Sequence, residues 1–317
     1  MIGRVILIAF VGLAASSVVI ASPIASVPRH VVVAQAGPGW MARDADPKHA
    51  WMYVASGLSN PILIYDLNSP VGPRKVGEIT DGLTRPGGIA VDAAGTLYAP
   101  NFNQGEPGGT VTIYPAGATS PSLTLSQGLS VPLDVAVDAS GNVYVVNRGT
   151  PPSIVVFPPG QTTPSETITS SLMQLPNQMV FDSAQNLFFT DDVAGVLEVP
   201  HGTQQPVSLN LQGLGDPQGL AFDPLTGNLF VSDLQFNKVF VYAPNNENAI
   251  RTVKIGFNSC FLSNGTIKNG EYLFVPDCRT SGTVWVFKHN ADKPITSWSF
   301  DTGIGACCLA FKPAGVP

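Results

Sequence analysis

The chain has few charged residues. Only 12% of its 317 residues are Asp, Glu, Lys or Arg, the formal net charge is −6, and the 16 Lys and Arg residues form no cluster. Nucleic acids and anionic membrane surfaces are therefore not expected as partners, because both are bound by concentrated positive charge. The low charge does not indicate disorder, since 44% of the residues are hydrophobic and the apolar positions alternate as they do in half-buried strands.

Motifs of catalysis and of cofactor binding are also missing. There are four histidines without a recurring spacing (His30, His49, His201 and His289), and neither a P-loop nor a dinucleotide fingerprint occurs. Nothing in the sequence therefore points to a metal cluster or a Ser-His-Asp triad. We predict no catalytic residue and no cofactor, and this favours a protein that is not an enzyme.

The start of the chain has the features of an export signal. Arg4 precedes an apolar run over residues 5–20, and small residues lead to a cleavage site after Ala21. We expect residues 1–21 to be a signal peptide, which makes the mature protein secreted or periplasmic and not membrane-bound. The alternative is an uncleaved anchor, although this run is slightly short for a membrane span.

One unit recurs along most of the chain. It reads Pro-x-Gly-hydrophobic-Ala-hydrophobic-Asp, then a Gly-Asn turn, a second short strand, and a Val-x-Val-Tyr strand that ends in Pro. Clear copies occupy residues 86–114, 132–158 and 217–244, and a weaker copy occupies 176–200. Repeats of this length with short alternating strands form radial blades, so the sequence predicts an all-β fold, a β-propeller.

The number of blades follows from the residue that ends the first strand of each unit. This position recurs at intervals of 41 to 48 residues, as Asp46, Asp92, Asp138, Asp182, Asp223, Asn264 and Lys312. Six intervals predict six blades of four antiparallel strands over residues 37–317, after an N-terminal extension at 22–36. We expect the C-terminal strand to return to blade one and close the ring, which protects the sheet edges.

Blade one is the least regular. Its supposed inner strand, residues 40–46, carries Arg43 and Asp44 where the other blades have apolar residues. We therefore expect residues 305–312 to compete for the innermost place in this blade, or to take it.

Two sets of aspartates invite a functional interpretation. The Asp that ends each first strand occurs once per blade at a turn, which indicates a structural role. Asp191, Asp192 and Asp233 follow second strands, and we favour Asx-turns there over carboxylates placed at the channel mouth.

The units resemble NHL-type repeats, most closely over residues 83–245. They are more distantly similar to the senescence-marker/gluconolactonase and paraoxonase propellers, and that resemblance implies a metal-dependent hydrolase with Ca²⁺ or another divalent cation at the axial mouth. The ligand position of those families corresponds here to Gly87, Leu133, Asn177, Gln218, Ser259 and Cys307. Asn177 matches the family's Asn ligand, and Asp134 lies one residue beyond the expected place. No Glu occupies the blade-one strand that carries the family's Glu ligand. Ca²⁺ requires six or more oxygen ligands, which is more than Asn177 and Asp134 supply.

Two functions follow from these patterns. The first is an exported, monomeric, non-catalytic module that binds a protein or a small-molecule ligand at the mouth where the inner strands begin. We predict that this mouth is lined by Gly88, Asp134, Asn177, Gln218 and Ser259. The alternative is a lactonase-like hydrolase with an atypical metal site at Asp134 and Asn177.

All four cysteines lie in the last fifth of the chain: Cys260, Cys278, Cys307 and Cys308. An even number in an exported chain predicts disulfides. Because antiparallel pairing places the start of one strand beside the end of the next, we expect all four on one face. We predict that Cys260 or Cys278 bridges to Cys307 or Cys308.

Overall fold

The computed structural model describes residues 39–57, 61–70, 72–102, 108–267, 270–278, 282–300 and 306–313. They belong to one compact unit, residues 35–317. The expected signal peptide and N-terminal extension lie outside the described residues. The described part of the chain consists of 25 strands and the loops between them, and none of it is a helix that could cross a membrane.

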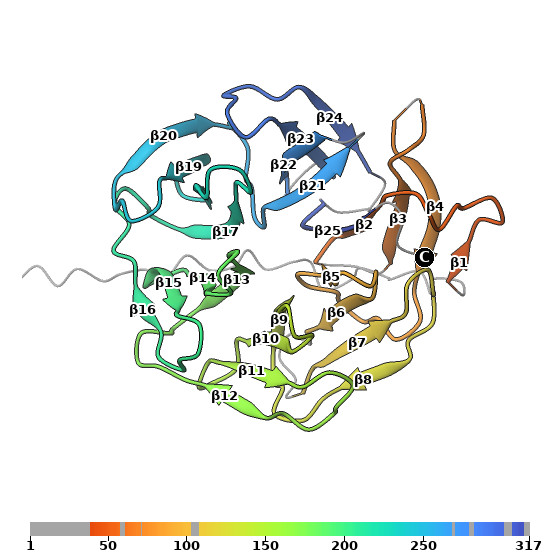
Figure 1. Cartoon of the computed structure of the whole chain (residues 1–317), viewed down its shortest axis with the longest axis horizontal. Coiled ribbons are helices and arrows are strands. Elements are labelled where there is room, and N and C mark those ends of the chain that lie inside the picture. Colours follow the sequence, from red (N-terminus) through yellow and green to blue (C-terminus); the bar gives the residue numbers. More distant parts are fainter. Residues whose placement is uncertain are drawn as a thin grey trace, which may run out of the picture. The chain divides into compact units, whose positions relative to one another are not determined.

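The strands form six antiparallel sheets arranged as the blades of a wheel (Figure 1). Blades two and three contain β5 (Ala90–Val91), β6 (Leu97–Asn101), β7 (Thr110–Tyr114), β8 (Leu123–Leu125), β9 (Pro132–Val137), β10 (Val143–Asn147), β11 (Ser153–Phe157) and β12 (Glu166–Ile168). Blades four and five contain β13 (Pro176–Phe181), β14 (Leu187–Asp191), β15 (Gly195–Val199), β16 (Val207–Ser208), β17 (Pro217–Phe222), β18 (Leu229–Asp233), β19 (Lys238–Tyr242) and β20 (Ala249–Lys254). Blade six contains β21 (Ser263–Ile267), β22 (Gly270–Pro276), β23 (Thr283–Phe287) and β24 (Thr296–Ser299).

Blade one joins the two ends of the described chain. Its sheet has the order β1-β4-β3-β2-β25, and its members are β1 (Trp40–Met41), β2 (Trp51–Ala55), β3 (Ile62–Asp66), β4 (Arg74–Ile79) and β25 (Cys308–Lys312). The C-terminal strand β25 pairs with β2 from Trp51↔Lys312 to Ala55↔Cys308. The predicted closure of the ring is thus confirmed, and the inner strands β5, β9, β13, β17, β21 and β25 contact one another in turn.

Residues 40–41 do not form the inner strand of blade one. They form β1, which pairs with β4 at the outer edge and makes this sheet five-stranded. The polar residues explain this position, because Asp44 binds Arg74 at 2.8 Å in an exposed ion pair, and a charged pair of this kind is far less costly at the edge than at the axis.

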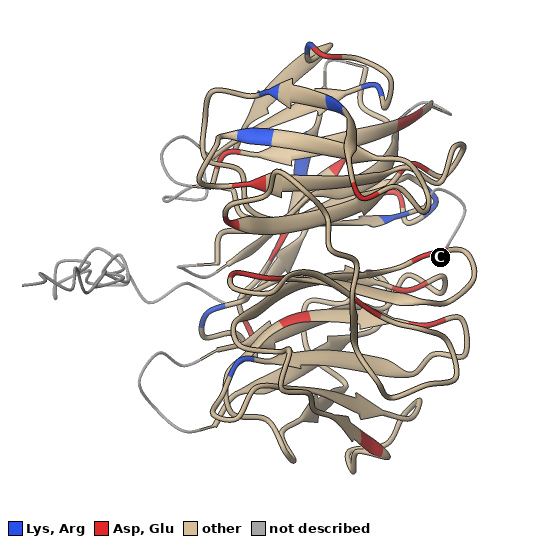
Figure 2. Cartoon of the chain, turned by 90° about the vertical axis from the view of Figure 1, so that its left-hand side faces the viewer, with Lys and Arg blue, Asp and Glu red and all other residues tan. Residues whose placement is uncertain are grey.

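The hydrophobic core lies between the blades. Val146 and Ile154 of blade three, for example, pack with Phe189 and Leu197 of blade four in one buried cluster. Four aromatic residues of blades three to six, Phe157, Phe189, Phe230 and Phe274, are almost completely buried, and each contributes roughly 1.5–3 kcal/mol by leaving water. Figure 2 shows Lys and Arg residues dispersed over the wheel rather than gathered on one face.

The repeated aspartates are structural, as predicted. Asp138 Oδ1 accepts hydrogen bonds from the amides of Ser140 and Asn142 at 2.9 and 2.8 Å, and Asp92 and Asp182 hold their turns in the same way. Asp191 is fully buried and accepts bonds from the Gln174, Leu175, Val193 and Ala194 amides. These carboxylates replace backbone partners that the turns lack.

Candidate binding site at the channel mouth

Three positions of the repeat meet on the face where the inner strands begin. Two of them we call the rim positions: the first residue after the repeat Pro, and the residue that follows the second-strand partner of this Pro. The second residue after the Pro is the plug position, and its members are Gly88, Asp134, Gln178, Gly219, Phe261 and Cys308. The equivalences in blades six and one rest on shared backbone contacts: Ser259 bridges Asp277 as Pro86 bridges Asn101, and Cys307 N binds Ala55 O as Gly87 N binds Pro100 O.

The plug side chains cross between blades at the axis. Asp134 Oδ2 accepts a hydrogen bond from the Met179 amide at 2.7 Å. Gln178 Nε2 donates to Leu262 O at 2.7 Å, and its Oε1 accepts from the amides of Leu220 and Leu262 at 2.8 and 2.9 Å. These bonds join blades three to six directly beneath the mouth.

Two glycines make room for this layer. A Cβ on Gly88 would lie 1.8 Å from Asp134 Oδ1 and 2.7 Å from the ring of Phe261, and one on Gly219 would lie 2.2 Å from Cys260 O. Side chains at some plug positions therefore fill the space that the glycines leave at the others. Asp134, Phe261 and Gly88 converge at one point of the channel.

Burial changes the chemistry of Asp134. Its side chain is 3% exposed, and desolvation raises the pKa of this carboxyl to about 8, against the smaller lowering effect of the Met179 and Val135 amides. The low-dielectric surroundings thus favour the neutral form of this carboxyl over the charged form.

Above the plug, five polar side chains from blades three to five form one network, which we call the mouth cluster: Arg148, Asn177, Asp192, Asp216 and Gln218. Arg148 binds Asp192 Oδ2 at 2.5 Å and Asn177 Oδ1 at 2.8 Å. Gln218 Nε2 donates to Asp192 Oδ1 at 2.9 Å and to Asp216 Oδ1 at 2.6 Å, and Asn177 Nδ2 also donates to Asp192. Asp192 therefore lies at the centre of the network.

The cluster is accessible from outside. The side chains of Arg148 and Asp192 are 27% and 24% exposed. Partial burial raises the pKa of Asp216, an effect that Asp192 and Asp233 reinforce and that the Gln218 hydrogen bond and Arg148 oppose. The two carboxylates and one guanidinium leave the cluster with a net negative charge when all three groups are ionised.

Exposed apolar residues flank the mouth cluster. Leu175 and Val193, 41% and 58% exposed, adjoin Asp192: Val193 follows it in the chain and Leu175 O accepts its amide. Phe236, 41% exposed, packs close to Gly215, the neighbour of Asp216. Single exposed apolar residues are ordinary, but several around one polar network are typical of interaction sites.

The predicted site residues separate into layers. Asn177 and Gln218 come together in the mouth cluster, while Asp134 and Gly88 lie below it in the plug. Ser259 is completely buried because it occupies the position of the repeat Pro, one residue before the predicted position. Cys260 occupies the rim position of blade six, which corresponds to Gln218 in blade five. Sequence reasoning did not single out Arg148 and Asp216, and it assigned Asp192 to a turn. A charged side chain at the rim position that follows the second strand is the sequence signal that could have found Arg148 and Asp192. The other four blades have uncharged residues there, namely Gly57, Phe102, Leu234 and Cys278.

The predicted metal ligands do not fit a divalent cation. Both polar atoms of the Asn177 amide are bonded to Arg148 and Asp192, and Asp134 is buried with its Oδ2 bonded to the Met179 amide. Among the described residues no group of three His, Cys, Asp or Glu side chains is placed to hold a metal. A Ca²⁺ site needs several ionised or carbonyl oxygens directed at one point.

The cysteines pair differently from the prediction. Cys260 and Cys278 form a disulfide within blade six, with Cα atoms 5.9 Å apart, while Cys307 and Cys308 are free. The expected bridge to Cys307 or Cys308 is wrong because the Ser259↔Asp277 bridge brings Cys260 and Cys278, the residues that follow these two, close together, whereas β25 belongs to the next blade.

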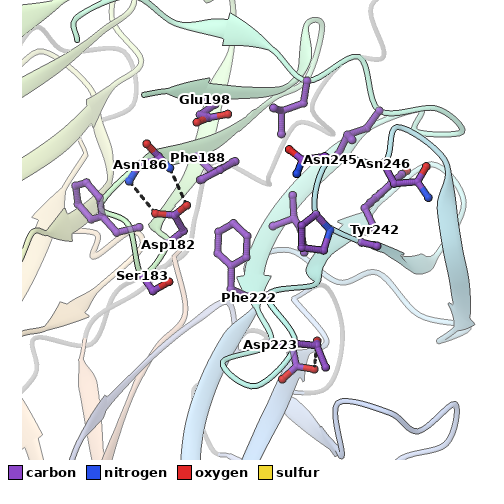
Figure 3. A pocket seen from close by; sticks show the side chains of 18 of the residues that line it. Asp182, Ser183, Asn186, Phe188, Glu198, Phe222, Asp223, Tyr242, Asn245 and Asn246 are labelled. Carbon is purple, nitrogen blue, oxygen red and sulfur yellow. Dashed lines mark hydrogen bonds between the residues drawn. The ribbon is translucent and has the colours of Figure 1, made fainter. Parts of the chain in front are cut away.

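A separate cleft lies between blades four and five, at the opposite ends of the inner strands (Figure 3). It has a volume of about 1070 Å³, and Phe188, Phe222 and Tyr242 are among its lining residues. Two of its carboxylates are engaged in turns, Asp182 with Asn186 and Asp223 with Thr226. None of the predicted site residues lines this cleft.

Comparisons with known proteins define the class by fold. No family model and no curated protein sequence matches the chain. Among solved structures it is similar to a chain of the "Crystal structure of Nidogen/Laminin Complex", with a TM-score of 0.66 and 14% identity over 83% of this chain and 98% of that chain. The protein is a six-bladed β-propeller. Because 1169 chains of solved structures are similar to it, the likeness selects no function.

Proposed function

We propose that the protein is an exported, non-catalytic binding module, built from NHL-like repeats, that holds a protein partner against the mouth face. The observation that carries this proposal is the mouth cluster. Five polar side chains from three consecutive blades interrupt the apolar repeat, bind one another and are flanked by exposed Leu175, Val193 and Phe236.

The shape of the mouth favours a protein over a small molecule. Small ligands are held in concave sites that cover most of their surface, but the buried plug residues Asp134, Gln178 and Phe261 fill the axis directly beneath the cluster. The mouth is therefore broad rather than deep. A central polar network with apolar neighbours matches the anatomy of a protein interface.

The charges of the cluster indicate the chemistry of the partner. Asp192 and Asp216 outnumber Arg148, and the whole chain is acidic. A Lys or Arg side chain of the partner would find its counter-charge at Asp216, while neighbouring apolar side chains of the partner would cover Val193 and Phe236. Such complementary charge mainly provides specificity and faster association.

Other observations support the remaining parts of the proposal. The Cys260–Cys278 disulfide fits an oxidising compartment, as does the apolar leader. In the mouth cluster Asp192 is paired with Arg148 and Asp216 accepts a hydrogen bond from Gln218, which supports a role in recognition. The similar solved structure is, by its title, a protein–protein complex.

Site-specific crosslinking tests the proposal. Full-length protein carrying a photo-crosslinker at position 193 would be exported from its source cells and irradiated there, with position 225 as the control. Leu225 is 85% exposed and lines the cleft at the opposite ends of the inner strands. We expect a discrete protein adduct at position 193 that Asp192→Lys abolishes, and no such adduct at 225. Equal adducts at both positions, or one that ignores Asp192→Lys, would contradict a partner at the mouth.

Metal analysis tests the non-catalytic part separately. The exported protein is measured for bound divalent cations before and after dialysis against a chelator, together with lactone hydrolysis. One equivalent of tightly bound cation with hydrolysis that the chelator removes would replace the binding-module proposal with the hydrolase alternative.

A further inference from the structure

Two thiols lie side by side where the closing strand begins. Cys307 is half-buried at a rim position and Cys308 is fully buried at the plug position, with their Sγ atoms 3.0 Å apart. We propose that Cys307 and Cys308 form a reversible vicinal disulfide, a redox site of the channel mouth that exchanges with dissolved disulfides such as oxidised glutathione. This site is distinct from the mouth cluster, which lies on blades three to five.

The local structure gives the Cys307 sulfur access to the mouth. Gly57 occupies the rim position beside it, where the other blades have Phe102, Arg148, Asp192, Leu234 and Cys278. A Cβ on Gly57 would lie 3.2 Å from Cys307 Sγ, so a larger residue at this position would cover the sulfur. Gly57 has a φ of +71°, which by itself favours glycine, and its missing side chain leaves this side of the Cys307 sulfur open.

The two cysteines take different parts in the reaction because their environments differ. The Cys307 sulfur attacks one sulfur of the incoming disulfide, which releases one thiol and leaves a mixed disulfide at Cys307. The Cys308 sulfur then attacks the Cys307 sulfur, its proton passes to the departing group, and a second thiol leaves. Two protein thiols are oxidised by two electrons, and the incoming disulfide is reduced to two thiols.

Burial assigns this order. Desolvation, together with the neighbouring Cys307 thiol, raises the pKa of Cys308 well above its usual value, so Cys308 remains protonated and is a poor first nucleophile. Its position 3.0 Å from the Cys307 sulfur makes it an efficient second one, because the attack is intramolecular and needs no further encounter.

Chain geometry makes the proposed bond labile. Adjacent residues have Cα atoms about 3.8 Å apart, which is below the usual range of about 4.4–6.8 Å for disulfides. A strained disulfide has a higher reduction potential and is reduced more easily. The Cα separation of 5.9 Å between Cys260 and Cys278 is within the usual range, so the protein would carry one stable and one labile disulfide.

A redox titration tests the proposal. The exported full-length protein is equilibrated with mixtures of oxidised and reduced glutathione, quenched in acid, alkylated after denaturation and mapped by mass spectrometry. In the oxidising mixtures we expect the peptide with Cys307 and Cys308 to lose two hydrogen atoms and to carry no glutathione. As the mixture becomes reducing, both cysteines should become alkylated together while Cys260–Cys278 stays intact.

Two variants separate the steps. Cys308→Ser should retain glutathione on Cys307, because the second attack is missing, and Cys307→Ser should leave Cys308 unmodified in the native protein. The proposal is overturned if wild-type protein keeps glutathione on Cys307 as the Cys308→Ser variant does, if both thiols stay free in the oxidising mixture, or if Cys260–Cys278 is reduced first. The wild-type titration decides the question even where a variant is not exported.

Discussion

Gln178 holds the backbone of Leu262 in both directions: its Nε2 donates to Leu262 O at 2.7 Å and its Oε1 accepts from Leu262 N at 2.9 Å. The two residues are 84 positions apart in the chain, and their side-chain to backbone contact spans the axis from blade four to blade six. Inner strands at the axis cannot pair with each other as sheet neighbours, so a long amide takes the place of the missing backbone partner.

Gln178→Ala is expected to destabilise the propeller by about 2–4 kcal/mol, because it leaves the buried amides of Leu220 and Leu262 and the Leu262 carbonyl without partners. Urea unfolding followed by tryptophan fluorescence measures the loss. The exposed Gln174 provides a matched control, and Gln174→Ala should change stability by less than about 0.5 kcal/mol. Equal effects of the two substitutions would show that Gln178 does not bind the blades together.

Asp134 makes stability depend on pH in an unusual direction. Its pKa is raised to about 8 in the folded protein, above the value of about 3.9 for an unfolded Asp. Between these values the folded state retains a proton that the unfolded state has lost. The stability contributed by Asp134 is therefore fully present below about pH 4 and declines as the pH rises, by about 1.4 kcal/mol per unit, until about pH 8.

Asp134→Asn should remove this pH dependence, because an amide keeps the acceptor for the Met179 amide and does not ionise. We expect the variant to match the wild type at about pH 4 and below, and to be clearly more stable near pH 8, as measured by urea midpoints at each pH. Parallel curves for the two proteins would mean that the Asp134 carboxyl ionises at its ordinary pH in the fold.

Adjacent aspartates provide a test of structure against binding. Asp191 is buried and accepts bonds from four loop amides, so Asp191→Ala should cost about 3 kcal/mol or more. Asp192 is partly exposed, and a pair of this kind contributes little, so Asp192→Ala should cost less than about 1 kcal/mol. The second variant should nevertheless lose the crosslinked partner at position 193. The assignment fails if Asp192→Ala melts as early as Asp191→Ala.

The blades could be predicted from sequence because their determinants are local. A strand that alternates, and a turn that begins with Asp138 or Asp182, look the same in every repeat, and the ring follows from counting them. Even the closing strand could be expected, since Arg43 and Asp44 make residues 40–46 unsuitable for the axis.

The mouth cluster could not be predicted in the same way. Arg148, Asp192 and Asp216 come from different blades and from two different positions of the repeat, and they meet because long side chains cross the gaps between blades. Blade six lacks the Pro that marks the register in blades two to five, and the resulting shift of one residue misplaced Ser259. A one-residue shift in a strand exchanges the faces of its side chains, and it places Cys260 instead of Ser259 at the rim.

The last prediction concerns the closure of the ring by β25. All five residues of β2 are buried, and β25 covers the edge of this strand over its whole length. Lys312 anchors the end of β25, with Nζ donating to Pro47 O at 2.5 Å and lying 4.9 Å from the Trp51 ring centre.

A chain that ends at residue 305 would leave the edge of β2 open, and an open, flat, apolar edge pairs with other chains. A chain that ends at Pro313 retains β25 and serves as the control. We expect the shorter chain to aggregate and to lose its cooperative thermal transition, and the longer one to melt as the full-length protein does, as followed by circular dichroism and size-exclusion chromatography. A monomeric shorter chain with an unchanged melting temperature would show that the ring does not depend on its C-terminal strand.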